Sequence, residues 1–189
     1  MTEMDRLKQI MDRLRGPDGC PWDREQSLET LCTFLLEETH EVLDAIAGGS
    51  AEAHKEELGD LLFQILFQAR VAEEAGRFGI EDVMRAIGDK IVRRHPHVFG
   101  GAPLSTSGQV LAQWEQIKVE ERRGRGDESM FSTVPPTLPA LLKALRISSK
   151  AARVGFEWPH LDALMEKVDE ELRELRGAIA SGRRASIEE

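Results

Sequence analysis

Two pairs of carboxylates recur at helical spacing in the segment "EETHEVLDAIAGGSAEAHKEELGD". Glu38 and Glu41 are three residues apart, and so are Glu57 and Asp60. Residues at this spacing project from one face of a helix. If the two helices pair, the four acidic side chains meet in one place, where they could bind a cation or exchange protons.

Such a cluster is electrostatically costly, because like charges repel and partial burial removes hydration. Protonation with a raised pKa is one outcome, and binding of Mg²⁺ or Mn²⁺, which prefer oxygen ligands, is another. A solvated acidic face paired with Lys and Arg is the third interpretation. Lys55 is the only Lys or Arg between Glu25 and Arg70, which weakens this third interpretation. The spacing alone leaves cation binding and a solvated face both open.

The elements that position these carboxylates are predicted to be helices, since apolar residues recur with helical periodicity and sustained alternation is absent. Asp23 is the expected N-cap of a helix over about residues 24–47, which Gly48 and Gly49 end. Ser50 is the expected cap of the next helix, to about residue 75. We expect further helices at about 80–95 and 109–121 and from about residue 138. A short glycine turn between the two acidic helices would place them antiparallel.

Composition limits the class of protein. The 189 residues carry a formal net charge of -9, which disfavours a general attraction to nucleic acid or to anionic membranes. Cys20 and Cys32 lack zinc-site spacing, which favours free thiols in a reducing cytosol. No apolar run approaches the about 20 residues that a membrane helix needs. We expect a cytoplasmic protein without a nucleic-acid or membrane partner.

The later part of the chain repeats the plan of the earlier part. Its pattern E-E-x-x-E recurs at Glu170, Glu171 and Glu174, and Glu188 and Glu189 repeat Glu56 and Glu57. The expected organisation is therefore a tandem all-α duplication whose second copy is incomplete. The expected domains are residues 1–122, a linker at 123–137, and 138–189. A second acidic site would contain Glu170, Glu171, Glu174 and Glu189, without an equivalent of Asp60.

Several further motifs occur in order along the chain: "GCPWD", "LEETHEVLDAI", "EELGDLLFQ", "RRHPHVF" and "WEQIKVEER". With the E-E-x-x-E and E-x-x-D motifs, they make the chain resemble the two-domain bacterial MazG nucleoside triphosphate pyrophosphohydrolases, truncated in the second domain. The resemblance implies an all-α bundle that dimerises and hydrolyses nucleoside triphosphates to monophosphates and pyrophosphate. A role in cleaning the nucleotide pool follows as an expectation.

The resemblance also implies site residues. Glu38, Glu41, Glu57 and Asp60 match the family's ligands of Mg²⁺, with Mn²⁺ as an alternative ion. Glu37 and Glu38 are the expected catalytic residues, Glu37 as the group that orients or deprotonates the attacking water. The residues matching nucleotide-binding positions are Lys90, Arg94, Trp114 and Lys118. Without the resemblance, the basic residues among these would be read as surface residues and Trp114 as a core aromatic.

Two other interpretations remain. A di-iron carboxylate protein needs two E-x-x-H helices, but of the two such patterns, one contains Pro159 in a turn. A helical dimerisation or regulatory module, catalytically weak on its own, is the other. The helix containing "LLFQILF" is apolar almost all round, so it needs cover on every side. We therefore expect a homodimer or a higher homo-oligomer in either case.

Overall fold

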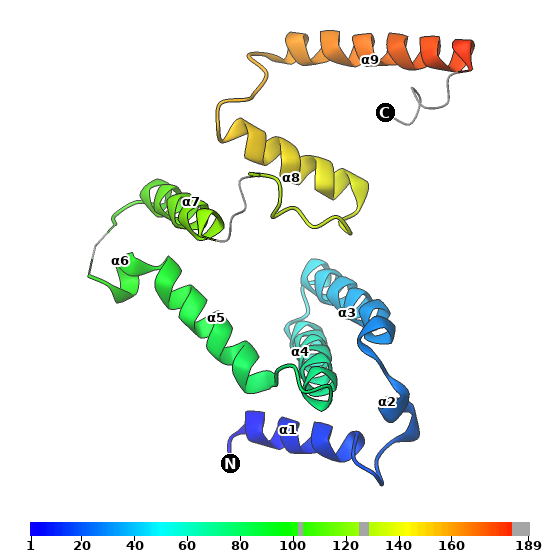
Figure 1. The fold of residues 1–189 in the computed structure, drawn as a ribbon, viewed down its shortest axis with the longest axis vertical. Coiled ribbons are helices and arrows are strands. Elements are labelled where there is room, and N and C mark those ends of the chain that lie inside the picture. Colours follow the sequence, from blue (N-terminus) through cyan, green and yellow to red (C-terminus); the bar gives the residue numbers. More distant parts are fainter. Residues whose placement is uncertain (102–103, 125–128, 183–189) are drawn as a thin grey trace. The chain divides into compact units, whose positions relative to one another are not determined.

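The computed structural model describes residues 1–101, 104–124 and 129–182. Within these ranges the chain is helical without any strand, which confirms the all-α prediction. The chain forms two compact units, residues 1–114 and 115–189. The tandem duplication and its domain boundaries stay predictions. The helices, shown in Figure 1, are α1 (Glu3–Leu14), α2 (Pro21–Glu25), α3 (Leu28–Gly48), α4 (Ala51–Glu74), α5 (Ile80–Arg94), α6 (Pro96–Phe99), α7 (Ser107–Arg123), α8 (Ala140–Ala152) and α9 (Leu161–Ser181).

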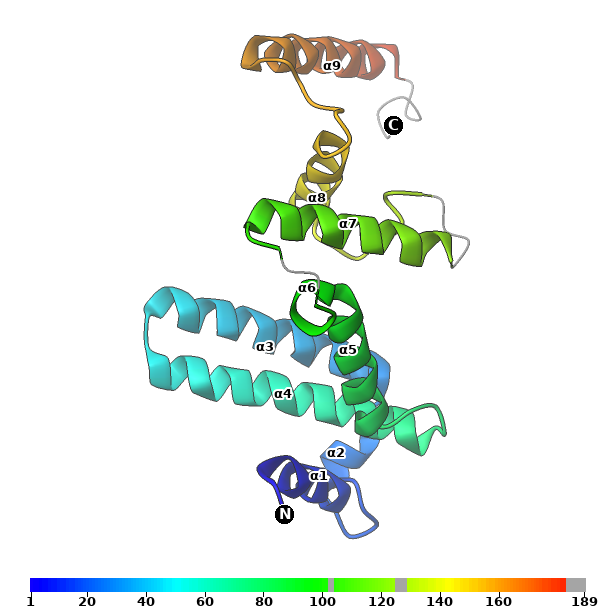
Figure 2. The same ribbon diagram turned by 90° about the vertical axis from the view of Figure 1, so that its left-hand side faces the viewer.

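Helices α3 and α4 form a long hairpin in the first unit (Figure 2). The turn between them follows from two local signals that the sequence predicts. Gly49 takes the left-handed conformation, with φ of 72°, which a side chain would strain. Ser50 then caps α4, since its side chain accepts a hydrogen bond from the Ala53 amide at 3.3 Å. This short turn places the two acidic helices side by side.

The start of α3 differs from the prediction. Asp23 is not an N-cap: it lies in the short helix α2, and Ser27 caps α3 through a reciprocal pair of hydrogen bonds with Thr30. Gln26 is extended between them, with ψ of 138°. The Arg15 guanidinium donates to the carbonyl oxygens of Asp23 and Gln26, so a distant cation satisfies the backbone at this break.

A small apolar core lies where α1, α3 and α4 meet. Met11, Leu31, Leu66 and Phe67 are almost fully buried there. Arg15 extends over the Phe67 ring, 5.4 Å from its centroid, and pairs with Glu74 at 2.7 Å. The core and this ion pair together attach α1 to α4, and α5 packs on α4 beyond them.

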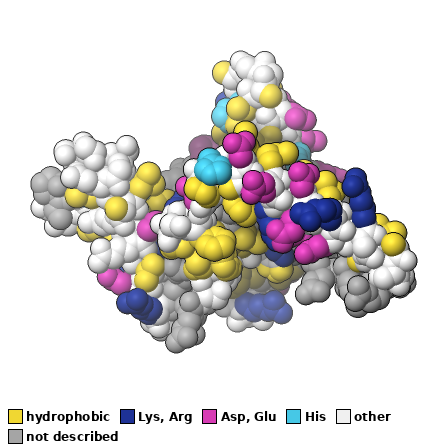
Figure 3. All heavy atoms as spheres, turned by 90° about the horizontal axis from the view of Figure 1, so that it is seen from above, with side chains coloured by type: hydrophobic (Ala, Val, Ile, Leu, Met, Phe, Trp, Pro, Cys, Tyr) yellow, Lys and Arg dark blue, Asp and Glu magenta, His cyan; other side chains and the backbone are white. Residues whose placement is uncertain are grey.

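Few side chains are buried in the described part of the second unit. The buried apolar residues there are Val134 and Ala178. Figure 3 shows one face of the molecule, on which acidic side chains lie beside Lys and Arg side chains, with apolar side chains between them. None of the helices in the described part of the chain combines the length and hydropathy that a membrane span requires.

Candidate functional site: a carboxylate cluster on the helix hairpin

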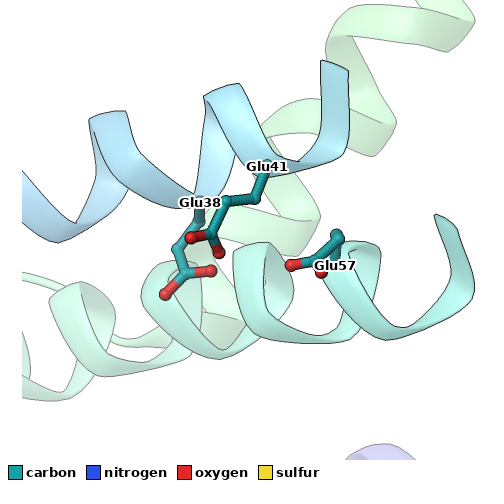
Figure 4. Close-up of side chains that lie close together, drawn as sticks. All are labelled: Glu38, Glu41 and Glu57. Atoms are coloured by element: carbon teal, nitrogen blue, oxygen red, sulfur yellow. The ribbon is translucent and has the colours of Figure 1, made fainter. Parts of the chain in front are cut away.

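Three glutamates meet between the helices of the hairpin. Glu38 and Glu41 come from α3 and Glu57 from α4, and Figure 4 shows their carboxylates directed toward the same space. One carboxylate oxygen from each lies within 4.8 Å of the others. Glu38 and Glu57 are half-buried, and Glu41 is exposed. Across the described ranges, no Lys or Arg forms an ion pair with any of the three.

Burial and mutual repulsion shift the acidity of this cluster. Desolvation raises the pKa of Glu38 above its usual range, and the charges of Asp60 and Glu41 raise it further. Desolvation also raises the pKa of Glu57, followed by the charges of Glu41 and Asp60. The hydrogen bond from Gln64 lowers the pKa of Glu38 but does not outweigh these effects, so an added cation would stabilise the ionised cluster.

Asp60 and Glu37 lie at the edge of the cluster. Asp60 is exposed on α4 and is not among the three carboxylates that converge within 4.8 Å, although its charge raises the pKa of both Glu38 and Glu57. Glu37 is exposed on α3, and its charge makes the smallest of the contributions to the raised pKa of Glu38. The structure thus brings three of the four expected ligands together and leaves Asp60 beside them.

Gln64 is a site residue that the sequence analysis missed. It lies seven residues after Glu57 and four after Asp60, so helical spacing puts it on the same face of α4. Its side chain is 8% exposed, and its amide nitrogen donates to a Glu38 carboxylate oxygen at 3.5 Å. Its amide oxygen is buried without a hydrogen-bond partner among the described residues. A buried polar atom left in this state costs about 1–3 kcal/mol.

The expected nucleotide-binding residues lie on α5 and α7. Lys90 is exposed and Arg94 is half-buried at the end of α5. Trp114 is half-buried and lies 6.3 Å from the His95 ring, centroid to centroid. Lys118 pairs with Glu115 at 3.2 Å and belongs to the second unit. Three of these residues are in the first unit, together with the carboxylate cluster.

The acidic motif of α9 has a different environment. The Lys167 ammonium pairs with Glu170 at 2.7 Å and with Glu171 at 3.1 Å, and its hydrogen bond to Glu170 lowers the pKa of that carboxyl. Phe34 stands at the corresponding place in the first motif. Glu174 is exposed, and Glu189 lies outside the described residues. The second motif therefore has a cation of its own where the first has an aromatic ring.

The donor set of the first cluster suits a hard divalent cation. All three converging groups offer carboxylate oxygens, which Mg²⁺ and Mn²⁺ prefer. Solvent reaches Glu41, so waters or a phosphate could complete the coordination. The amide of Gln64, whose nitrogen bonds to Glu38, also contains a buried oxygen that could accept a hydrogen bond.

Comparison with known proteins places this geometry in context. Residues 26–99 match the MazG nucleotide pyrophosphohydrolase domain. The whole chain is 47% identical to an Escherichia coli K12 protein named nucleoside triphosphate pyrophosphohydrolase and covers 73% of it. A Thermotoga maritima protein named nucleoside triphosphate pyrophosphohydrolase/pyrophosphatase MazG is 45% identical. The match covers 92% of this chain and 66% of the length of that protein. The crystal structure of a mazG-related protein from Thermotoga maritima superposes with a TM-score of 0.53 at 30% identity, covering 60% of this chain and 97% of that one.

Proposed function

The chain belongs to the MazG family, as its motifs suggested, and from this premise we propose that it is a Mg²⁺-dependent nucleoside triphosphate pyrophosphohydrolase. Its substrates are nucleoside and deoxynucleoside triphosphates, and its products are the monophosphate and pyrophosphate. The observation that carries the proposal is the convergence of Glu38, Glu41 and Glu57 within 4.8 Å without a described Lys or Arg partner. Removal of unwanted nucleotides from the pool is the proposed cellular role.

Glu38, Glu41 and Glu57 would hold the cation, and Asp60 would join them after a change of side-chain rotamer or through water. Asp60 is exposed on the helix face that carries Glu57, so such a movement is sterically open. When bound, the cation would offset the charge of the triphosphate and lower the pKa of a coordinated water. Mn²⁺ should substitute, because it accepts the same oxygen ligands.

Glu37 is the proposed group that orients the attacking water and accepts its proton. The water oxygen bonds to the α-phosphorus, and the bond from this phosphorus to the bridging oxygen of the β-phosphate breaks. Pyrophosphate leaves with the electron pair of that bond, and the proton passes from Glu37 to solvent. Glu37 is exposed, which gives it access to water and an exit for the proton.

The nucleotide itself is proposed to contact α5 and α7. Lys90 and Arg94 are four residues apart on α5, so both cations project from one side of the helix. Their charges would offset the phosphates in the transition state. The same role for Lys118, which belongs to the second unit, stays a prediction. Trp114 offers a half-buried ring beside His95, which suits contact with a base.

Phosphorus NMR tests the proposed reaction. The wild-type chain, incubated with a panel of nucleoside triphosphates and Mg²⁺, should give monophosphate and pyrophosphate, and Glu38→Gln should give neither. Glu52→Gln is the matched control, because Glu52 lies on α4 in an exposed pair with Lys55 outside the cluster. In ¹⁸O-labelled water, the label should enter the monophosphate, which identifies attack at the α-phosphorus. If all triphosphates survive while Mg²⁺ binds, the helical dimerisation or regulatory module is the better interpretation.

The hairpin also supports a homodimer or higher oligomer as the working form. Large apolar side chains on α3 and α4 are 41–63% exposed in the single chain, which is unusual for helices that carry the core: Leu36, Leu43, Ile46, Leu58 and Ile65. A second hairpin packed on this surface would remove them from water. Light scattering at micromolar concentration should give at least twice the 21.2 kDa of one chain, and a monomer mass would exclude this form.

A cytoplasmic location completes the proposal. Cys20 and Cys32 are both free thiols in the structure, and Cys32 is exposed. Unpaired thiols persist in reducing compartments. Alkylation of both thiols in protein isolated without reductant would support this location, and an intermolecular disulfide would contradict it.

A further inference from the structure

In the buried side-chain amide of Gln64, one polar atom forms a hydrogen bond and the other does not. Its nitrogen faces a Glu38 carboxylate oxygen at 3.5 Å, whereas its oxygen has no partner among the described residues. Turning the amide over would not help, because the amide oxygen would then face a carboxylate oxygen and the nitrogen would be left alone. Either orientation therefore leaves at least one buried polar atom unsatisfied in the cation-free protein.

A buried glutamine in an otherwise apolar stretch of helix calls for a reason. Gln64 stands in the segment "LLFQILF", between Phe63 and Ile65, and is more deeply buried than either. An apolar side chain of similar size would fill the space without an unsatisfied atom. Buried polar groups in this state mark functional sites or a missing hydrogen-bond partner. Among the described residues, the Gln64 side chain hydrogen-bonds to a single charged group, the Glu38 carboxylate of the cluster.

We propose that Gln64 is a positioning residue of the cation site, with its nitrogen holding the Glu38 carboxylate and its oxygen accepting a hydrogen bond from the hydrated cation. Mg²⁺ and Mn²⁺ keep several waters when proteins bind them, and those waters donate hydrogen bonds. The buried oxygen belongs to the same amide group as the nitrogen that bonds to Glu38, so it is a candidate acceptor for such a donor. The inference rests on the proposed function, because it needs the cluster to bind a cation.

Gln64→Met should keep the stability of the cation-free protein and weaken its affinity for the cation. Methionine has similar length and no strong polar atom, so the cation-free protein should be as stable as the wild type or more stable. Cation affinity should fall by about 10-fold, the lower end of the effect that outer partners of metal ligands have. A purely structural role for Gln64 predicts the reverse, namely loss of stability with unchanged affinity for folded protein.

The test measures Mn²⁺ binding by electron paramagnetic resonance and thermal unfolding in EDTA, with the full chain. Gln68→Met is the matched control, because Gln68 is half-buried one turn further along α4 and outside the cluster. Gln64→Leu repeats the change with a stiffer side chain. We expect weaker Mn²⁺ binding in both Gln64 variants, unchanged binding in the control, and no loss of unfolding temperature in EDTA.

The outcomes separate the two proposals. If the wild type binds Mn²⁺ and the Gln64 variants bind it equally well, the role of Gln64 is refuted while the cation site stands. If both Gln64 variants unfold in EDTA at a lower temperature than the wild type, Gln64 is a structural residue and the inference is likewise refuted. Absence of Mn²⁺ binding by the wild type overturns the proposed cation site and the inference together.

Discussion

Replacing Glu38 with glutamine should stabilise the cation-free protein and abolish its response to Mg²⁺. The carboxylate oxygens of Glu38 and Glu41 lie within 4.8 Å of each other. At that separation two unit charges repel by about 1 kcal/mol in bulk water and by about 3 kcal/mol at an effective dielectric constant of 20. Glu41 is exposed, so the lower value applies. Glutamine keeps the shape of Glu38 and an oxygen that can accept the hydrogen bond from Gln64.

The assay compares unfolding temperatures at neutral pH in EDTA and in excess Mg²⁺. A gain of about 1 kcal/mol corresponds to a rise of about 2–4 °C for a chain of this size. The wild type should gain about 2.7 kcal/mol when Mg²⁺ is present at about 100 times its dissociation constant. Glu38→Gln should show the rise in EDTA and almost none of the further gain. The wild type and the variant would then exchange their order of stability when Mg²⁺ is added.

Glu52→Gln is the control for this experiment. Glu52→Gln removes one member of an exposed ion pair with Lys55, which should change stability by less than about 0.5 kcal/mol. A Glu38→Gln variant less stable than the wild type in EDTA would refute the repulsion argument. Retention of the full Mg²⁺ response in that variant would refute the assignment of Glu38 as a ligand.

Three further predictions follow from the same structure. Because the pKa values of Glu38 and Glu57 are raised, protons compete with the cation, and Mg²⁺ affinity measured by calorimetry should fall from about pH 7 to about pH 5. Over that descent the folded carboxyls bind protons that the unfolded chain does not, so the EDTA-treated protein should gain stability from these groups; a flat affinity profile would contradict both statements. Arg15→Met should lower the unfolding free energy by about 2–3 kcal/mol in urea titrations, because the buried guanidinium bonds to Glu74 and to the backbone at the start of α3; a change below about 1 kcal/mol would contradict this. Gly177→Ala should stabilise α9 by about 0.5–1 kcal/mol by thermal circular dichroism, since an added Cβ meets no atom within 4 Å; destabilisation would indicate an unseen contact.

The helices and most of their ends were predictable because their signals are local. Gly49 and Ser50 act within one turn of chain, and the structure shows both in the expected roles. The start of α3 was assigned to the wrong cap. Asp23 is a residue type that favours N-cap positions, but it lies in α2, and Ser27 caps α3 through hydrogen bonds with Thr30. The Ser27–Thr30 cap starts α3, and the Arg15 guanidinium from the end of α1 satisfies the carbonyl oxygens just before it.

The acidic motif of α9 differs from the first motif in a way that local spacing already indicates. Lys167 is three residues before Glu170 and four before Glu171, which is the spacing of helical ion pairs. The structure shows both pairs formed, so Lys167 partly offsets the charge of the acidic motif of α9. The corresponding Phe34 leaves the first motif without such a cation. Because this difference lies within a single helical turn, a residue-by-residue alignment of the two motifs is enough to distinguish them.

By itself, the sequence determined the all-α class, the hairpin turn, the family and the identity of the acidic residues, since periodicity, capping and motif order are properties of neighbouring residues. The tertiary structure alone decided which carboxylates meet. It brings Glu38, Glu41 and Glu57 within 4.8 Å and leaves Asp60 outside that group, although spacing treats Asp60 as the equal of Glu57. It also buries Gln64 against Glu38 across the hairpin. The rotation and register of α3 against α4 set these distances, and both depend on packing between residues remote in the chain.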